Sequence, residues 1–339
     1  MKIANANLMK EMNMNLVRLV MKQAETATKP QLAALTRLSV VTINSLAKEL
    51  LERGEIYENQ VVASNGGRPA LTYSYNYNFR QALVICLKEQ GGERFASAIV
   101  VNLGNRAVAK QEYILPAYDR QFFREIVHQF MGSHPDIQMI GLGIPGQTVD
   151  GTIVVSSHEE LQGTSIVTEI GHESGLPVIV ENDVNAAIIG YAAREKTAEA
   201  GEAVAGIYFP GKYPPGMGIY LDGRIIKGRN GMAGEIKFLP LAADWYTELA
   251  PSAFMHAACQ IIQSVNAVLA PDKIVIYQKF VGEAEWTPFW ERYRMEQPMP
   301  QYPEILLLDS FQEDYEAGMR QLILNQLDPA VTGYTAQVL

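Results

Sequence analysis

The sequence predicts a mixed α/β protein that carries a small helical unit at its N-terminus. Short helical patterns fill the first 53 residues, and from Ala82 onward buried strand patterns alternate with helical ones. That alternation is typical of α/β folds. The chain is 339 residues long, which exceeds the usual ~100–200 residues of one domain. We therefore expect two or three domains.

Composition narrows the classes of protein that fit. Hydrophobic residues make up 48% of the chain and charged residues 19%, which excludes wholesale disorder and fibrous repeats. No apolar run approaches the ~18 residues of a membrane helix, and the first residues lack the layout of a secretory signal. We expect a cytoplasmic protein with no membrane partner. Cys86 and Cys259 are too few for a disulfide framework or a cysteine-based zinc site.

Positive charge is concentrated at the N-terminal end of the chain. Residues 1–80 contain ten Lys and Arg against six Glu and no Asp, a net charge of +4, whereas the whole chain carries −9. The remainder therefore carries −13. A polyanion such as DNA would be attracted to the first eighty residues and repelled by most of the rest.

Three helices are expected before Gly54. The first covers Asn15–Gln23, where apolar residues follow a buried-helix pattern. Thr28 can cap the second helix and Ser39 can cap the third, which runs to about Arg53. The expected inner face of the second helix consists of Leu32, Ala33 and Leu35. Three short helices in about forty residues indicate a helix-turn-helix.

The third helix has an outer face that suits DNA. Its apolar residues are spaced to face the core: Ile43, Leu46, Ala47, Leu50 and Leu51. The outward residues, with those at the helix starts, form the candidate DNA contacts: Lys29, Ser39, Val40, Val41, Thr42, Asn44, Ser45 and Lys48. Asparagine and serine can hydrogen-bond base edges, valine can contact a thymine methyl, and lysine can reach a phosphate in the major groove.

Two β-prone runs follow the third helix. They cover residues 55–63 and 70–76 and are joined by Ser-Asn-Gly-Gly-Arg-Pro. This pattern predicts a winged hairpin, because the two glycines allow a tight turn. Arg68 at its tip could enter a narrow minor groove or hold a phosphate. A small helical module that binds another protein is the alternative for this unit, since helix-turn-helix packing does not by itself require DNA.

The remaining elements follow the α/β pattern. Strands are expected at 82–87, 95–102, 108–114, 137–144, 176–180, 203–209, 217–221, 273–277 and 304–308. Helices are expected at 120–131, 165–174, 183–198, 256–269, 285–294 and 314–327. The first two strands should form an antiparallel pair.

Several segments together resemble the ROK family of sugar-responsive repressors and sugar kinases. KPQLAALTRLSVVTINSLAKELLERGEI and the run NGGRP resemble its winged helix-turn-helix, which its kinases generally lack, although Arg37 stands where that turn usually has glycine. GLGIPGQTVDGTIV resembles its Pro-Gly loop, VIVENDVNAAIIGY its Glu-Asn-Asp sugar segment, and LDGRIIKGRNGMAGEI the run that ends in its Ala-Gly-Glu-Ile sugar contact.

The resemblance implies a division into three units. Residues 1–80 would form the winged helix-turn-helix. Residues 81–198 and 199–339 would form the two α/β lobes of an actin-like ATPase fold of the ribonuclease H type, the second lobe including the C-terminal helices.

The resemblance also implies a sugar site. It makes Asn182, Asp183 and Glu235 the expected ligands of sugar hydroxyls, with Pro145 and Gly146 lining the same cleft. A site built from carboxylates and an amide rejects compounds that lack the matching hydroxyls, because its own polar groups would be left unpaired. The alternative is that Asp183 only caps the next helix and Glu235 is a surface charge.

The sequence departs from the family's kinases in three nucleotide-binding elements. Residues 89–93 read Glu-Gln-Gly-Gly-Glu where the kinases have Asp-x-Gly-Gly-Thr, and a second glycine-rich loop is replaced by Pro210–Gly216, which contains three prolines. Tyr277-Gln278-Lys279 replaces glycines after the last long strand. A lost hydroxyl, an added carboxylate and missing N–H donors leave little to hold phosphate. We expect no kinase activity and no cofactor.

The family's zinc site is also expected to be missing. Lys237 and Phe238 stand where the family has glycine and histidine, and no Cys-x-Cys-Gly follows. We therefore expect no metal. His158-Glu159-Glu160 lies in a loop where the family contacts sugar, so it is a candidate effector contact, although a solvent-exposed loop is the simpler expectation.

These observations predict a transcriptional regulator, a repressor, that binds operator DNA as a homodimer or dimer of dimers and responds to a sugar or sugar derivative. A sugar kinase with a DNA-binding appendage is one alternative. The other is an effector-free regulator controlled by a protein partner.

Overall fold

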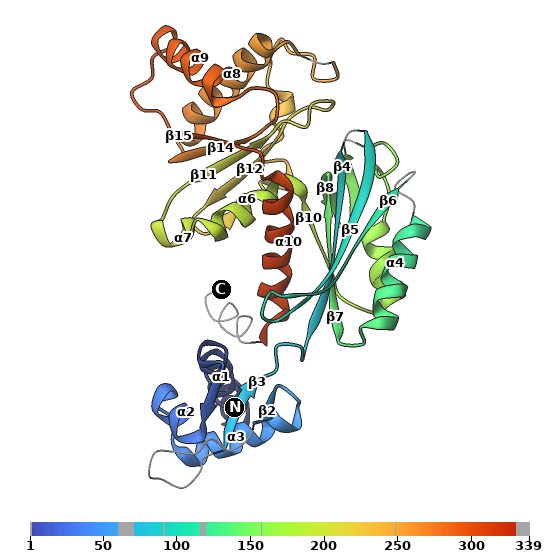
Figure 1. Cartoon of the computed structure of the whole chain (residues 1–339), viewed down its shortest axis with the longest axis vertical. Helices are drawn as coiled ribbons and strands as arrows, with labels where there is room; N and C mark the ends of the chain where they lie inside the picture. The colour runs from blue at the N-terminus through green and yellow to red at the C-terminus, as the bar shows by residue number, and fades with distance from the viewer. Residues whose placement is uncertain are drawn as a thin grey trace.

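The computed structural model describes residues 2–59, 71–90, 92–115, 120–156, 158–247 and 249–329. Figure 1 shows a small N-terminal unit below two α/β lobes, with the long helix α10 (Phe311–Leu327) between the lobes. No helix in these ranges combines the length and the apolar character needed to cross a bilayer.

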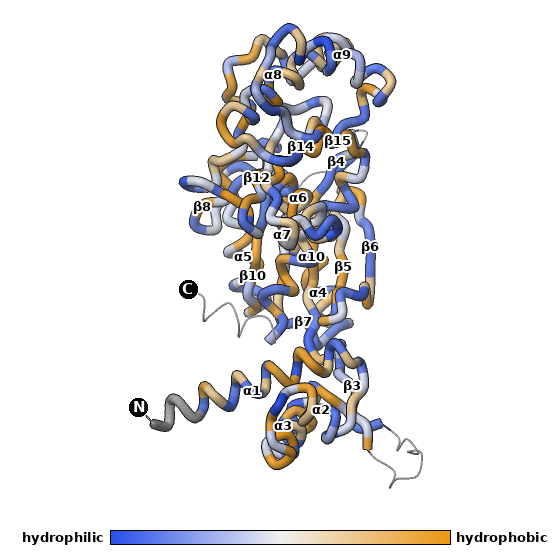
Figure 2. The backbone as a smooth tube through the Cα atoms, turned by 90° about the vertical axis from the view of Figure 1, so that its left-hand side faces the viewer, coloured by the Kyte–Doolittle hydropathy of each residue, from blue (hydrophilic) through white to orange (hydrophobic). Residues whose placement is uncertain are grey.

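The N-terminal unit contains the three predicted helices and a small sheet. The helices are α1 (Lys2–Ala24), α2 (Lys29–Thr36) and α3 (Val40–Glu52). The antiparallel sheet has the order β1 (Thr26–Thr28), β3 (Thr72–Tyr75), β2 (Ile56–Glu58). Helix α1 starts earlier than predicted, and Figure 2 shows that it projects beyond the other two helices. Arg68 lies outside the described residues.

The predicted caps set the boundaries of α2 and α3. The Thr28 hydroxyl accepts from the Gln31 amide at 3.3 Å while the Gln31 side chain accepts from the Thr28 amide at 2.8 Å, forming a capping box. Ser39 accepts from the Thr42 amide at 3.1 Å. Arg37 has φ +58° in the turn between the helices. It thus adopts the left-handed conformation that a glycine would favour there.

One expectation for α2 is wrong. Leu35 is 59% exposed, and Thr36 is buried instead, with its hydroxyl donating to the Leu32 carbonyl at 2.6 Å. Residues four apart lie on one helix face, so the inner face of this short helix follows Leu32 and Thr36.

The first lobe is built on a five-stranded sheet. Its order is β10 (Val178–Asn182), β7 (Ile137–Ile144), β4 (Gln81–Gln90), β5 (Glu93–Asn102), β6 (Ala107–Leu115). Strands β4, β5 and β6 are antiparallel neighbours, as predicted for the first pair, whereas β7 and β10 run parallel to β4. Alternate residues of β4 face opposite layers. Leu83 packs with α4 (Arg120–Ser133) and α5 (Ile166–Ser174), and Val84 packs with the central helices.

The second lobe has a five-stranded sheet of its own. The order is β13 (Arg224–Ile225), β12 (Gly216–Leu221), β11 (Val204–Tyr208), β14 (Lys273–Tyr277), β15 (Glu304–Leu308). Helices α8 (Pro251–Leu269) and α9 (Glu283–Glu296) cover one face of it. Helix α6 (Asp183–Arg194), which the short α7 (Thr197–Ala200) follows, packs against β11 and β12 on the other face.

Helices α6 and α10 cross between the lobes with their backbones in contact. A Cβ atom on Gly190 would lie 1.9 Å from the Asp314 carbonyl oxygen, and one on Gly318 would lie 1.8 Å from that of Ala186. Only glycine fits at either position. Helix α10 packs on β4 and β7 of the first sheet, while α6 packs on the second sheet. Each helix therefore contacts the lobe on the other side of the predicted boundary at residue 198. The boundaries at residues 80 and 198 stay predictions.

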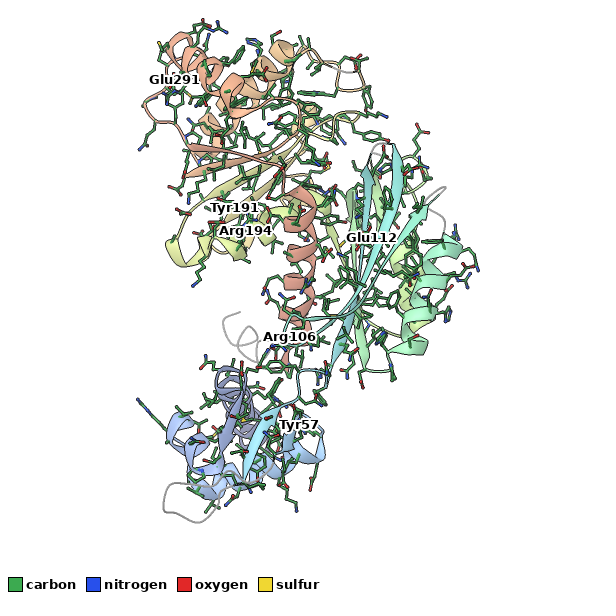
Figure 3. The ribbon with its side chains drawn as sticks, viewed as in Figure 1. Tyr57, Arg106, Glu112, Tyr191, Arg194 and Glu291 are labelled. Atoms are coloured by element: carbon green, nitrogen blue, oxygen red, sulfur yellow. The ribbon has the colours of Figure 1, made fainter. Side chains whose placement is uncertain are left out.

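A buried carboxylate strengthens this crossing. Asp314 on α10 accepts from Arg194 at 2.7 Å, from the Tyr277 hydroxyl at 3.0 Å and from Ser310 at 3.0 Å. Figure 3 labels Arg194 on α6, beside α10. The contact therefore joins α6, β14 and α10 into one polar cluster.

Candidate functional site

A cleft of about 1360 Å³ opens between the two lobes. Its first-lobe wall comes from the end of β4, the Pro145-Gly146 loop and the segment after β9 (Thr152–Ser156). Its second-lobe wall comes from the loop between β11 and β12 and from the segment around Glu235, and the start of α10 also contributes. A ligand in this cleft would therefore touch both lobes.

Asn182 is a structural anchor at the β10–α6 junction. Its side-chain oxygen accepts from the amides of Val184 and Asn185 at 2.9 and 3.1 Å and so caps α6. Its amide nitrogen donates to the Gly146 carbonyl at 3.2 Å and to Asp183 at 3.0 Å. The amide thus fixes two predicted site residues in place. Asn182 itself lines a neighbouring 280 Å³ cavity rather than the main cleft.

Asp183 lines the main cleft at the start of α6. One carboxylate oxygen accepts from the Val184 amide at 2.9 Å and from Asn182. Burial, with a smaller contribution from the Glu235 charge, raises the pKa of Asp183 from 3.8 to about 7, against the effect of these hydrogen bonds. Near neutral pH this group can therefore donate to, or accept from, a ligand hydroxyl. The helix cap is Asn182, so capping alone does not account for Asp183.

Glu235 reaches the cleft through a tight backbone contact. Gly234 has φ +89°, and a Cβ on it would lie 1.9 Å from the Met217 carbonyl oxygen, so this position needs glycine. Glu235 then begins the 3₁₀ turn η2 (Ile236–Phe238), and its carboxylate lies 3.1 Å from the Lys237 ammonium. Both side chains line the cleft. A ligand at Glu235 would also meet a positive charge.

The cleft is also bridged by contacts between the lobes. The Tyr213 hydroxyl, from the loop after β11, donates to Glu89 of β4 at 3.2 Å. His158 lies 3.7 Å from the same carboxylate and packs edge-on against the Tyr213 ring. Burial lowers the pKa of His158, although Glu89 and Glu160 oppose that effect. The expectation that this loop is solvent-exposed is wrong for His158, which is only 4% exposed because Tyr213 covers it.

The outward face of α3 has the predicted exposure. Val41 is 79% exposed, and Asn44, Ser45 and Lys48 are exposed as well, while the four most inward apolar residues are buried. The Lys48 ammonium lies 3.8 Å from Glu52 on the same surface, a contact that contributes little free energy. The exposed side chains remain available to a partner.

The residues at the helix starts have partly structural roles. The Ser39 and Thr42 hydroxyls hydrogen-bond each other at 2.8 Å, and Lys29 lies over the Tyr73 ring. Val40 is exposed. Their contact with DNA stays a prediction.

The model of the ROK family matches residues 85–260, just over half of the chain. The chain belongs to the ROK family.

The relatives include named ROK regulators. The chain is 23% identical over 245 residues to the xylose repressor of Caldicellulosiruptor bescii, covering 69% of this chain and 60% of that protein. It is 24% identical over 246 residues to the DNA-binding transcriptional dual regulator NagC of Escherichia coli K12, covering 69% of this chain and 59% of that protein. The chain thus matches about 60% of the length of these curated relatives.

Solved structures confirm the two-lobed ROK fold. The crystal structure of a ROK family transcriptional regulator, a homolog of the E. coli MLC protein, superposes with a TM-score of 0.61 at 18% identity and covers 96% of this chain and all of that one. Sugar kinases are also among the relatives and structural neighbours. The predicted actin-like ROK fold is therefore confirmed.

A local hydrogen-bond cluster holds the segment after β14, where the resemblance predicts that the family's kinases have glycines. The Gln278 side chain accepts from the amides of Phe280 and Val281 at 2.7 and 3.0 Å and donates to the Val281 carbonyl at 2.7 Å. Gln278 is buried, so it fills the space that glycines would leave open. The loop Pro210–Gly216, in turn, is held by the Tyr213 contact.

Aromatic side chains form part of the cleft wall. Phe238, Trp245, Tyr246 and Phe280 line the cleft, and Trp245 packs 5.8 Å from Phe209 between ring centres. No three His, Cys, Asp or Glu side chains in the described ranges come together in a way that could hold a metal ion.

Pro145, Gly146, Asp183 and Glu235 thus meet in one cleft, as predicted, although their role as sugar ligands stays a prediction. A Cβ on Gly146 would lie 2.4 Å from the Val155 carbonyl oxygen, which explains the glycine. The candidates from sequence omit Lys237, Tyr213 and Glu89. A positive charge two residues after the key glutamate was the available signal for Lys237, whereas the Tyr213 contact joins segments far apart in sequence.

Proposed function

We propose that this ROK protein is a sugar-responsive transcriptional regulator, a repressor without kinase activity. One observation carries the proposal. The same chain combines an exposed helix face in a positively charged unit with a cleft that contains the carboxylates of Asp183 and Glu235, while protein side chains fill the elements that would bind nucleotide in a kinase. Its place would be the cytoplasm.

The N-terminal unit is proposed to be a winged helix-turn-helix that covers residues 1–80. Helices α2 and α3 are joined by a short turn, and the β1-β3-β2 sheet packs beside them. In such units the second helix enters the major groove. The side chains of α3 that point away from the core are suited to base edges and phosphates. Similarity to named repressors supports this role.

The interlobe cleft is proposed to bind a sugar or sugar derivative at Asp183 and Glu235, with Pro145 and Gly146 beside them. Asn182 would act by holding Asp183 and the Gly146 loop, because both hydrogens of its amide are already donated. The pKa of Asp183, raised to about 7, suits a group that exchanges hydrogen bonds with hydroxyls. Residues 81–198 and 199–339 would supply the two walls.

The residues expected to hold nucleotide in the cleft disfavour a kinase role. Glu93 places a carboxylate where the kinases have threonine, and Tyr213 and His158 pack around the Glu89 side chain of the same loop. An added carboxylate beside a phosphate would disfavour nucleotide binding, because like charges repel. Sugar binding without phosphoryl transfer is then the function left to the cleft.

The regulator is proposed to act as a homodimer or a dimer of dimers. Helix-turn-helix proteins read two half-sites about one DNA turn apart, ~34 Å, which a two-fold dimer matches. A sugar can change this spacing only through a difference in its affinity for two arrangements of the protein.

The function is tested by selecting DNA from a random library with the full-length protein. Affinity for the selected operator is then measured alone and with D-xylose, D-glucose, N-acetyl-D-glucosamine and their phosphates. We expect one of these sugars to change the affinity by about tenfold, within the usual range of allosteric coupling. Asp183→Asn should weaken that response and leave unliganded affinity within a few fold, whereas the exposed Asp222→Asn should respond as wild type.

The outcomes separate the alternatives. Failure to select any sequence would contradict DNA recognition. An operator without a response to any sugar would favour an effector-free regulator, and ADP release that depends on sugar would favour a kinase. An Asp183→Asn protein that responds at wild-type sugar concentrations would show that the sugar binds elsewhere.

A further inference from the structure

Helix α10 connects the cleft to the N-terminal unit. Phe311 and Gln312 at its start line the cleft, and its other end is directed toward the N-terminal unit in Figure 1, where Asp328 pairs with Lys22 of α1. Its 17 residues span roughly 25 Å at the rise of an α-helix. One rigid element therefore touches both proposed functional regions.

The cleft end of α10 is fixed to the second lobe. The Phe311 ring stacks on Tyr208 of β11 with 3.6 Å between ring centres, and it packs edge-on against Tyr277 of β14. One turn later, Asp314 binds Arg194 and Tyr277. A movement of the second lobe relative to the first would therefore pull on the start of α10, which also packs on β4 and β7 of the first sheet.

The other end of α10 is fixed to the N-terminal unit. Lys22 of α1 forms an ion pair with Asp328, the residue that follows α10, and also donates to the Leu103 carbonyl at 3.1 Å. Arg80 donates to the Leu327 carbonyl at 3.3 Å. The Lys22 and Asp328 side chains are only 21% and 5% exposed. This is a largely buried polar contact between the two bodies, beside the chain connection itself.

We propose that α10 transmits the state of the cleft to the N-terminal unit, and that Lys22 and Asp328 are the positioning residues that make this transfer. The inference rests on the proposed function, because it describes how a sugar in the cleft would reach the DNA-binding face. Close-packed interiors pass on small displacements rather than absorb them, and helix shifts of ~1–2 Å are common in such transitions. Because little solvent surrounds the Lys22–Asp328 ion pair, we expect it to move together with the end of α10.

The experiment measures the position of the N-terminal unit directly. Spin labels are placed on Ala34→Cys of α2 and Glu125→Cys of α4, both exposed sites, in the full-length chain. The native Cys86 and Cys259 are buried and do not compete for label. The distance between the labels is read by double electron–electron resonance, which requires neither DNA nor sugar.

The perturbation is Gly318→Ala, which forces α10 away from α6 where their backbones touch. It is introduced into wild type, into Asp328→Asn, and into Glu316→Gln as a matched control. Glu316 is a carboxylate on α10, but its partners Lys110 and Arg320 lie outside the N-terminal unit. If Gly318→Ala fails to fold, Phe311→Leu at the cleft end takes its place.

We expect a shift of the label distance by about 2 Å in wild type and in Glu316→Gln, and no shift in Asp328→Asn. Exchanging the charges, with Lys22→Asp and Asp328→Lys together, should restore the shift. An equal shift in Asp328→Asn, or no shift in any background, would overturn the proposal. Because the readout is independent of operator and sugar, either result leaves the proposed function to its own test.

Discussion

Replacing Asp183 by asparagine should change how stability depends on pH. Burial raises the pKa of this carboxyl from 3.8 to about 7. Between these values the folded protein holds a proton that the unfolded chain has released, so wild-type stability falls as pH rises through this window. The stabilising effect of the bound proton is complete below pH 4 and lost above pH 7. Asparagine does not titrate and removes the dependence.

The magnitude follows from the width of that window. Each pH unit between pH 5 and pH 7 is worth about 1.4 kcal/mol, so wild type should lose at most about 3 kcal/mol relative to the variant. Asp183 retains some exposure, and we therefore expect about 2 kcal/mol. For lobes of this size such a change moves the unfolding midpoint by about 4–8 °C. The Val184 and Asn182 hydrogen bonds survive, because the asparagine oxygen can accept both.

The assay is thermal unfolding of wild type, Asp183→Asn and the exposed control Asp222→Asn, each at pH 5 and pH 8. The midpoint of Asp183→Asn should rise relative to wild type on going from pH 5 to pH 8, and the control should follow wild type. If the two curves stay parallel, the carboxyl is not held in its protonated form by burial, and the argument that it exchanges hydrogen bonds with hydroxyls near pH 7 is lost.

The other predictions concern the N-terminal unit and catalysis. Asn44→Ala should cost ~1–3 kcal/mol on the selected operator and far less on random DNA; equal losses in a binding titration would show that α3 does not read bases. Arg18→Met leaves Glu55 buried without its bidentate partner and should destabilise the unit by about 3–5 kcal/mol in urea unfolding, whereas Arg18→Met with Glu55→Leu should recover most of that loss. ATP with any hexose should give no sugar-dependent ADP release; even about one turnover per minute, abolished by Asp183→Asn, would contradict the non-enzyme assignment.

Much of the fold could be predicted because its strands are apolar runs with clear ends. The predicted ranges of β7, β14 and β15 agree with the structure residue for residue. The ribbon of β8 (Gly146–Val149) and β9 was not predicted, because each strand is short and partly polar and exists only through pairing with the other. Strand β1 was missed for the same reason.

The helix crossing could not be read from the sequence. Gly190 and Gly318 interrupt otherwise helical segments, and nothing in either segment indicates that the two glycines meet. Their contact depends on α10 returning to the first sheet after the second lobe is complete. Long-range returns of this kind are set by tertiary packing rather than by local pattern.

The cleft could be predicted only in part, because some of its residues are placed by local motifs and others by contacts between distant segments. Asp183 and Glu235 belong to local motifs, each placed by a neighbouring strand end or glycine, so a resemblance could locate them. The bridge between Glu89 and Tyr213 joins two lobes, and the burial of His158 follows from it. A property that arises from two distant segments has no signature in either one.

This bridge also bears on how the protein would respond to sugar alone. In a two-substrate kinase, contacts to both sugar and nucleotide contribute to closing the lobes around them. Here the Tyr213 hydroxyl and Glu89 already form a contact between the lobes within the cleft. A single hydrogen bond from a neutral hydroxyl to a carboxylate contributes only about 1.5–3 kcal/mol. This is enough to reduce the free-energy difference between the open and closed arrangements of the lobes without fixing either one. We infer that sugar binding needs to supply only the rest of the free energy of closing the lobes. Weakening the contact between Tyr213 and Glu89 should therefore raise the sugar concentration needed for a response without changing which sugar binds.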